Sequence, residues 1–486
     1  MPADHASPAG YRRDIDGMRA LAVLAVVLFH AYPRTVTGGF VGVDVFFVIS
    51  GFLISGLIFD DLDRGRFSLA GFYARRIRRI FPALLLVLTA TLAYGFVVLL
   101  PVELAALGEQ TAGGAGFVAN LLLWRDAGYF DRAAVTKPLL HLWSLGVEEQ
   151  FYIVWPVALW ALHRARLPPL ACILAAAGVS FAVNVVLSVS DPTADFYSPV
   201  TRLWELAAGA ALALRREMLP ARGRDWASVA GLAVIVGCVA GFDPGMAFPG
   251  WPALLPVGAT VLLIAAGPGP GAVVNRVVLS NRVAVGIGLI SYPLYLWHWP
   301  LIAYAHVLRG GRGPRELVAL GLIGASLVLA WLTWRLVEQP VRRGAPGRGM
   351  VFGLAGLMAV VGLAGLAVRQ AEGPPGRLWD AGEVDIAGIN AAVAEGIFRA
   401  TQDMRLRKTD GITLTQLGEG SGGVLLTGDS LLFHYGPRVQ ALFSAGQLAG
   451  PGRCGSSSGR AARRYRGSAG RRRLPPAMRC RGWRRR

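Results

Sequence analysis

Charged side chains are scarce in this sequence of 486 residues. Asp, Glu, Lys and Arg together make up 16% of it, whereas about a quarter of the residues of a soluble domain are charged. Hydrophobic residues make up 54%, and apolar runs of about 18 or more residues recur along the chain. This composition excludes an ordinary soluble protein and predicts an α-helical polytopic membrane protein.

Cysteine is rare as well. The four cysteines are Cys172 and Cys238, in apolar runs, and Cys454 and Cys480, near the C-terminal end. They form no C-x-x-C pair and have no spacing typical of metal ligands. We therefore expect no metal site, and the cysteines indicate no redox compartment.

Acidic residues are missing from the last part of the chain. Residues 452–486 contain 13 arginines and no Asp or Glu, so the net charge of +19 falls to +6 without them. A nucleic-acid partner would depend on this tail alone, and we expect none. The tail has two open interpretations: a shifted reading frame or premature end in a GC-rich gene, or a genuine basic tail.

The apolar runs predict about eleven membrane-spanning segments. They lie at 18–33, 40–59, 81–100, 144–162, 170–190, 197–214, 226–242, 252–267, 283–305, 315–336 and 350–368.

The basic residues between these segments predict their orientation, because cytoplasmic loops are enriched in Lys and Arg. A cytoplasmic N-terminus places five basic loops on that side and leaves 308–316 as the exception. The chain after Ala367 would then lie outside the cytoplasm. The polar leader, which includes Asp14 and Asp16, argues against a cleavable signal peptide.

We expect a membrane domain, an additional span, a linker, the start of an α/β domain and the arginine-rich tail, at 11–345, 346–368, 369–420, 421–450 and 451–486. In the fourth part VLLTGDS predicts a buried strand that ends in a tight turn at Asp429 and Ser430.

His30 lies deep in the first apolar run, eleven residues after Arg19. Eleven residues make about three turns, so both side chains share one helix face and lie about 16 Å apart along the axis. A polar residue inside a membrane is a functional candidate. The simpler alternative is a histidine bonded to a neighbouring helix.

The run FYARRIRRIFP holds two arginine pairs spaced three residues apart, Arg75 with Arg78 and Arg76 with Arg79. Such spacing aligns guanidinium groups on one helix surface, and their planar forks suit phosphate. An anchor at the cytoplasmic surface is the simpler interpretation.

Acidic residues also enter the apolar runs. Glu148 and Glu149 stand at the mouth of one span, with His141 seven residues earlier, and Asp44 lies inside another. A histidine beside a carboxylate can act as an oriented general base. A structural ion pair with an arginine is the alternative.

Two further candidates are weaker. His298 stands between two tryptophans near a membrane end, where it could simply belong to an aromatic belt. Ser430 could be a nucleophile on a strand-to-helix turn. However, no acid follows Asp429, and His434 is the only later histidine. We therefore expect Ser430 to be vestigial.

Several long blocks in the same order resemble acyltransferase family 3, the membrane O-acyltransferases that include O-antigen and peptidoglycan O-acetylases. They include YRRDIDGMRALAVLAVVLFHA, FYARRIRRIFPALL, LLHLWSLGVEEQFYIVWP and ISYPLYLWHWPL. The family's arginine–histidine motif falls on Arg19 and His30, its paired arginines on Arg76 and Arg79. Its acidic block matches Glu148 and Glu149, and its second-span aspartate matches Asp44.

The resemblance implies a bacterial inner-membrane enzyme that takes an acyl group, usually acetyl, from acyl-CoA inside to a glycan hydroxyl outside. No cofactor would be bound. Arg76, Arg79 and Arg19 would hold the CoA phosphates, and His30 would act as general base or acyl carrier, oriented by Asp44 or Glu149. VLLTGDS is similar to the first block of an SGNH-type domain, whose later Asp-x-x-His block has no counterpart here.

Two other readings stay open. In a transporter, the histidine and carboxylates would relay protons and the arginines would bind an anion, but no inverted repeat of interrupted spans is visible. An inactive fragment is the third possibility. The acceptor, the acyl chain and the oligomeric state do not follow from the sequence.

Overall fold

The computed structural model describes residues 11–127, 134–215, 219–269, 271–344 and 347–371, with four short strands beyond them. The chain is divided into two compact units, Met1–Pro374 and Pro375–Arg486. Each is described by itself.

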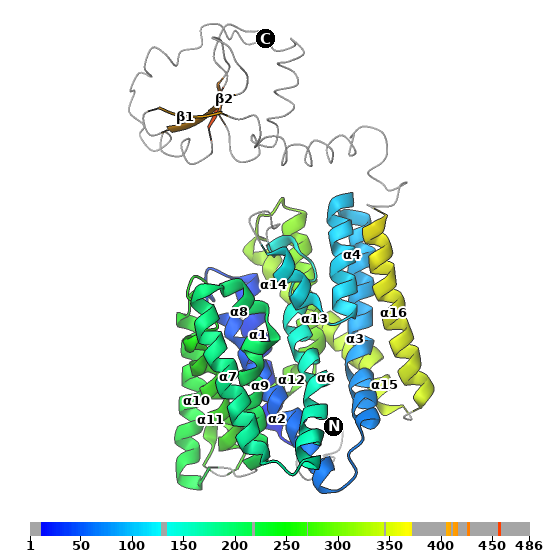
Figure 1. Cartoon of the computed structure of the whole chain (residues 1–486), viewed down its shortest axis with the longest axis vertical. Coiled ribbons are helices and arrows are strands. Elements are labelled where there is room, and N and C mark those ends of the chain that lie inside the picture. Colours follow the sequence, from blue (N-terminus) through cyan, green and yellow to red (C-terminus); the bar gives the residue numbers. More distant parts are fainter. Residues whose placement is uncertain are drawn as a thin grey trace. The chain divides into compact units, whose positions relative to one another are not determined.

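The described part of the first unit is built from helices (Figure 1). Their bounds are α1 (Arg13–Ala31), α2 (Gly42–Asp63), α3 (Leu69–Val98), α4 (Pro101–Ala115), α5 (Ala119–Asp126), α6 (Leu142–Arg164), α7 (Pro169–Ser190), α8 (Pro192–Tyr197), α9 (Pro199–Arg215), α10 (Ala221–Gly241), α11 (Leu254–Ala266), α12 (Arg282–Leu289), α13 (Ser291–Val307), α14 (Glu316–Thr333), α15 (Gln339–Arg343) and α16 (Arg348–Gln370). Short π-helical turns at Val274–Leu279 and Trp334–Glu338 precede α12 and α15.

Six helical stretches among the described residues are long and apolar enough to cross a membrane. They are Gly39–Asp63, Leu69–Val98, Pro169–Ser190, Arg222–Gly241, Glu316–Arg343 and Arg348–Gln370. The other predicted spans also fall on helices, which do not reach the same length and apolar composition. The prediction of a polytopic α-helical membrane protein is confirmed.

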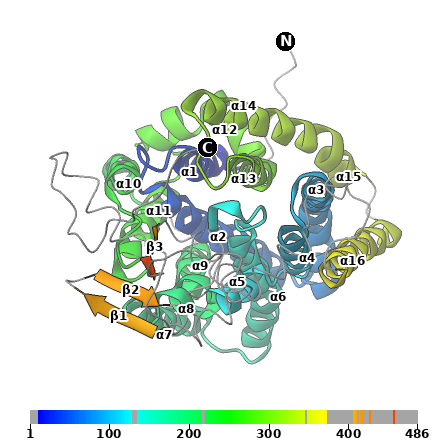
Figure 2. The same ribbon diagram turned by 90° about the horizontal axis from the view of Figure 1, so that it is seen from above.

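The connection between the predicted spans at 81–100 and 144–162 contains two helices, α4 and α5. Pro101 opens α4, and the Glu103 carboxylate accepts a hydrogen bond from the backbone N–H of Leu100 at 3.0 Å. Leu104 and Leu107 are fully buried. Figure 2 shows α4 beside α3 and α16. The sequence did not indicate α4 because this helix is too short and too polar to resemble a membrane span.

Helix α3 begins twelve residues before the predicted span, at Leu69. The Ser68 hydroxyl caps it by accepting a hydrogen bond from the Gly71 N–H at 3.2 Å, as serine commonly does at this position. The arginine run and the apolar run therefore form one continuous helix, which fixes where the arginines point.

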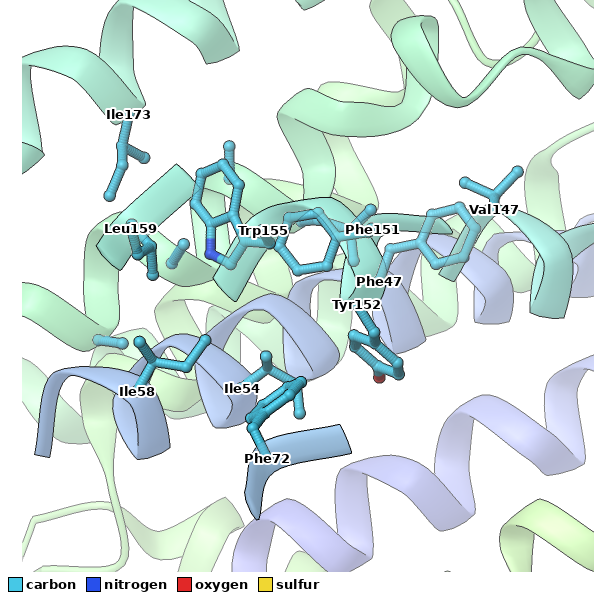
Figure 3. Close-up of a cluster of buried hydrophobic side chains, with 14 of the residues drawn as sticks. Phe47, Ile54, Ile58, Phe72, Val147, Phe151, Tyr152, Trp155, Leu159 and Ile173 are labelled. Atoms are coloured by element: carbon cyan, nitrogen blue, oxygen red, sulfur yellow. The ribbon is translucent and has the colours of Figure 1, made fainter. Parts of the chain in front are cut away.

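Helices α2, α3 and α6 share a hydrophobic core (Figure 3). Its side chains include Phe47, Ile54, Ile58, Phe72, Val147, Phe151, Trp155 and Leu159. Trp155 also donates a hydrogen bond from Nε1 to the Ser55 hydroxyl at 2.8 Å.

Helix α9 lies unusually close to α2. A Cβ atom on Gly51 would lie 1.8 Å from the carbonyl oxygen of Leu206, and one on Gly209 would lie 2.0 Å from that of Val48. Only glycine permits this approach of two backbones. It brings Asp44 of α2 within reach of Arg202 of α9.

In the second unit the structure describes four strands, β1 (Arg405–Thr409), β2 (Ile412–Gln416), β3 (Leu425–Thr427) and β4 (Gly455–Ser457), in the order β1-β2-β4-β3. The β3–β4 pair is parallel and the other pairs are antiparallel. The predicted strand before the GDS turn coincides with β3. Ser430 and His434 lie outside the described residues.

Candidate functional site

A cavity lies among α1, α2, α3, α6 and α13 of the first unit. Its polar lining residues are Arg19, Ser50, Arg76, Arg79, Ser144, Glu148, Glu149, Tyr152, Ser291, Tyr292 and Tyr295. Five predicted site residues therefore surround one space, although they come from three helices. Apolar side chains such as Phe47 and Ile54 complete the wall.

Three arginines form the cationic side of this cavity. Arg19 pairs with Asp16 at 3.3 Å. Neither Arg76 nor Arg79 forms an ion pair with any residue that the structure describes; the Arg76 guanidinium instead lies 5.3 Å from the ring centre of Tyr152. Because arginine stays charged and presents a fork of donors, these two side chains can bind an anion.

The two arginine pairs on α3 have different surroundings. Arg75 pairs with Asp61 at 3.0 Å on the exposed surface. Arg78 donates hydrogen bonds to the backbone carbonyls of Val341, Arg342 and Gly344, at 3.1, 3.1 and 2.7 Å. Of the four arginines, only Arg76 and Arg79 line the cavity.

The two adjacent glutamates are used differently. The Glu148 carboxylate accepts hydrogen bonds from the hydroxyls of Ser50 and Tyr152. Glu149 is 6% exposed, and its Oε1 has no hydrogen-bond partner among the described residues. A buried, unmatched acceptor is costly, so Glu149 adds a polar atom to the cavity that a ligand could satisfy.

Three histidines, His30, His141 and His298, lie together; we call them the histidine group. Nδ1 of His30 is 2.9 Å from Nε2 of His298, and the two rings are almost parallel, at 12°, with centres 5.2 Å apart. With nitrogens so close and centres so far apart, the rings meet edge to edge through a hydrogen bond. His141 is perpendicular to His298, with centres 5.7 Å apart.

Tyr295 lines the cavity and also contacts the histidine group. Its hydroxyl lies 2.6 Å from the Ser144 hydroxyl and donates to the backbone carbonyl of His141 at 2.8 Å. Its own backbone carbonyl lies 2.7 Å from Nδ1 of His298. Tyr295 therefore lies between the cavity and the histidine group, and along α1 Arg19 and His30 are about three turns apart.

Exposure distinguishes the three histidines. His298 and His141 are 0% and 2% exposed, whereas His30 is half-buried. His30 is thus the member of the histidine group that a molecule outside the helices can reach.

Asp44 lies elsewhere. It is fully buried and pairs with Arg202 at 3.2 Å, and Arg202 pairs in turn with Glu205 at 3.2 Å. Among the described residues, no hydrogen bond or ion pair joins Asp44 to His30. No such contact joins Glu149 to His30 in this part of the chain either, and His30 is instead hydrogen-bonded to His298.

Some residues of these sites were not singled out in the sequence. Arg202 and Glu205, three residues apart at the start of an apolar span, were the visible signal for the ion pairs. Ser50, Tyr152 and Tyr295 carry no such signal, since hydroxyl side chains are common in membrane helices. No cluster of three metal-ligating side chains occurs within the described ranges.

Fold and site together define a polytopic membrane protein with a polar-lined cavity among its helices. A family described as an acyltransferase domain matches residues 12–335. The chain belongs to this acyltransferase family.

Several bacterial proteins are similar to this chain. BcsY of Komagataeibacter xylinus, described as a membrane-bound transacylase, is 36% identical over 68% of this chain and 83% of its own length. Peptidoglycan O-acetyltransferase OatA of Listeria monocytogenes is 29% identical over 68% of this chain and 56% of its own. O-acetyltransferase OatA of Staphylococcus aureus is 28% identical over 68% and 57%.

The chain thus spans most of BcsY but little more than half of either OatA protein. No solved structure matches it.

Proposed function

We propose that this protein transfers an acyl group, acetyl in the simplest case, from acyl-CoA to a hydroxyl of an extracytoplasmic glycan. Lipopolysaccharide O-antigen, peptidoglycan and exopolysaccharide are the acceptor classes. The names of the OatA relatives support O-acetyl transfer. The basic loops support a bacterial inner-membrane location with α1 starting in the cytoplasm and α16 ending outside it.

The arginine side of the cavity binds the donor in this proposal. CoA carries several phosphate oxygens, and charge-assisted hydrogen bonds to arginine are among the strongest available. Arg76 and Arg79 have no competing ion pair among the described residues, and Arg19 adds a third positive charge. The CoA phosphates are therefore held at the cytoplasmic ends of α1 and α3.

The pantetheine arm then extends along the cavity, past Glu148 and Glu149, towards Tyr295. This route follows α1, on which Arg19 and His30 lie about 16 Å apart. It brings the thioester to the histidine group while the phosphates stay near the membrane surface, where their charge is hydrated.

His30 acts as the general base. The acceptor hydroxyl gives its proton to a ring nitrogen of His30 as its oxygen attacks the acyl carbon. The carbon–sulfur bond breaks, and the CoA thiolate leaves and takes that proton from His30, so that free CoA, an ester and neutral His30 are the products. Such proton transfer typically contributes about 10²–10⁴-fold to the rate. A transient acyl-histidine is the alternative route.

One observation carries the proposal: Arg76 and Arg79, which have no ion pair among the described residues, line the same cavity as Tyr295. Tyr295 in turn contacts the histidine group, in which the half-buried His30 is hydrogen-bonded to His298. A transporter would also use an anion site. It would not consume acyl-CoA.

The test is release of free CoA thiol from acetyl-CoA by the purified full chain in nanodiscs, with a panel of glycans. We expect glycan-stimulated release that disappears in His30→Ala and persists in His163→Ala, since His163 is exposed at the far end of α6. Normal CoA release by folded His30→Ala protein would exclude His30 as the general base. No release by the unmodified chain with any acceptor would favour the transporter.

A further inference from the structure

His298 is joined to two neighbours by hydrogen bonds that fix where its proton lies. Its Nδ1 is 2.7 Å from the backbone carbonyl of Tyr295. A carbonyl oxygen can only accept a hydrogen bond. Nδ1 of His298 therefore carries a proton.

The state of Nε2 follows from burial. His298 is 0% exposed, and no carboxylate among the described residues pairs with it. The groups around it are His30, His141 and Tyr295. A buried cation without a counter-charge costs several kcal/mol, so His298 is neutral. Its Nε2 then holds a lone pair and accepts a hydrogen bond.

The donor to that lone pair is His30, whose Nδ1 lies 2.9 Å away. In a neutral His30 the proton therefore sits on Nδ1, and Nε2 is left without one. Without a partner, imidazole can carry its proton on either nitrogen, and only one of the two forms has a free Nε2.

We propose that His298 is a positioning residue that holds His30 in the Nδ1-protonated form and so keeps Nε2 free to accept a proton. This inference rests on the proposed role of His30. It assigns to a neutral histidine the part that a carboxylate has in a Ser–His–Asp triad, where the acid fixes the tautomer and orientation of the base.

The fold supports this division of labour. His298 is fully buried, does not line the cavity, and is bound by the carbonyl three residues earlier in its own helix. It is held by α13, so its Nε2 presents a fixed acceptor to α1. When His30 takes a second proton, its Nδ1–H still donates to His298, so the hydrogen bond persists through the reaction.

The first measurement is solid-state NMR of the full chain in nanodiscs, labelled with ¹³C and ¹⁵N in its seven histidines. The signal that disappears in His30→Ala belongs to His30. We expect it to show a protonated Nδ1 and an unprotonated Nε2. In His298→Leu, which has no acceptor, it should move towards the Nε2-protonated form.

The second measurement uses His298→Gln, whose side-chain oxygen can accept near the position of Nε2. This variant should keep the Nδ1-protonated form and retain most acetyl transfer. His298→Leu should lose about 10²–10³-fold in kcat with little change in the KM for acetyl-CoA, as expected for a misplaced general base. Variants are compared only if their thermal unfolding matches that of the unmodified chain.

An Nε2-protonated His30 in the unmodified chain would overturn the proposal, as would an unchanged tautomer in His298→Leu. The NMR result does not depend on transfer activity. A chain without acetyl transfer but with the expected tautomer would refute the proposed function and leave the His30–His298 relation standing.

Discussion

Two groups of charged side chains lie inside the first unit, and they differ in whether the charged side chains form ion pairs with one another. Around Arg202 the charges meet each other: Asp44 and Glu205 both lie 3.2 Å from the guanidinium, and all three are buried. Around the cavity, Arg76 and Arg79 have no ion pair in the part of the chain that the structure describes. In the first arrangement each acid has an ion-pair partner within the protein, and the Asp44–Arg202 pair joins α2 to α9; we call Asp44, Arg202 and Glu205 the complete group. Arg76 and Arg79, which we call the open group, leave room for an anionic ligand.

The largest effect should come from breaking the complete group. Arg202→Leu leaves Asp44 and Glu205 as unpaired buried acids, which typically costs 3–5 kcal/mol. We expect a much lower unfolding temperature and little folded protein, measured in nanodiscs with acetyl-CoA absent. If Arg202→Leu unfolds like the unmodified chain, the ion pairs do not stabilise the α2–α9 contact.

Breaking the open group should affect binding and leave stability unchanged. Removing an arginine that binds phosphate costs about 1.5–3 kcal/mol, so Arg76→Ala and Arg79→Ala should each raise the KM for acetyl-CoA by about 10–100-fold. Steady-state CoA release checks this.

Arg75→Ala is the matched control on the same helix. Its exposed ion pair with Asp61 contributes at most about 1 kcal/mol, so its KM should stay within twofold. Equal losses in Arg75→Ala and Arg76→Ala would mean that net positive charge matters and the cavity does not.

A smaller effect concerns Asp195, in α8 beside the complete group. Burial raises the pKa of Asp195 from 3.8 to about 6, and its Oδ1 accepts a hydrogen bond from Asn184 at 2.9 Å. The folded protein then holds a proton that the unfolded chain releases, so stability should fall as pH rises from about 4 to 6.

Asp195→Asn keeps the acceptor and removes the charge. It should remove this part of the pH dependence and stabilise the protein by about 1 kcal/mol at pH 7, measured as the unfolding temperature at pH 5 and pH 7. Unchanged pH dependence in Asp195→Asn would show that another group titrates.

The comparison of the two groups also shows what the sequence can predict. Each apolar run marks its own helix, and Arg19, His30, Arg76 and Arg79 stand out because charge inside such a run is unusual. These features are local. They identified the apolar helices, the charged side chains that line the cavity and the three members of the histidine group.

Neighbouring residues in the sequence do not show which side chains will pair across helices. Nothing near Asp44 in the sequence indicates that it pairs with Arg202, because the pairing depends on two glycines that bring α2 and α9 together. Likewise, His298 looks like part of an aromatic belt until α13 packs against α1. Helix α4 was missed because tertiary contacts, including buried Leu104 and Leu107, stabilise a segment without a spanning pattern.

Helix α1 is unbroken from Arg13 to Ala31, so residues along it are held at fixed distances from one another. The rise of 1.5 Å per residue sets the separation of Arg19 and His30, whatever movements occur between other helices. In the proposed reaction, this fixed separation would select a donor by the length of the arm between its charged head and its reactive carbon. Inserting a single alanine between the two residues would turn His30 by about 100°, which would separate it from His298 without removing any side chain.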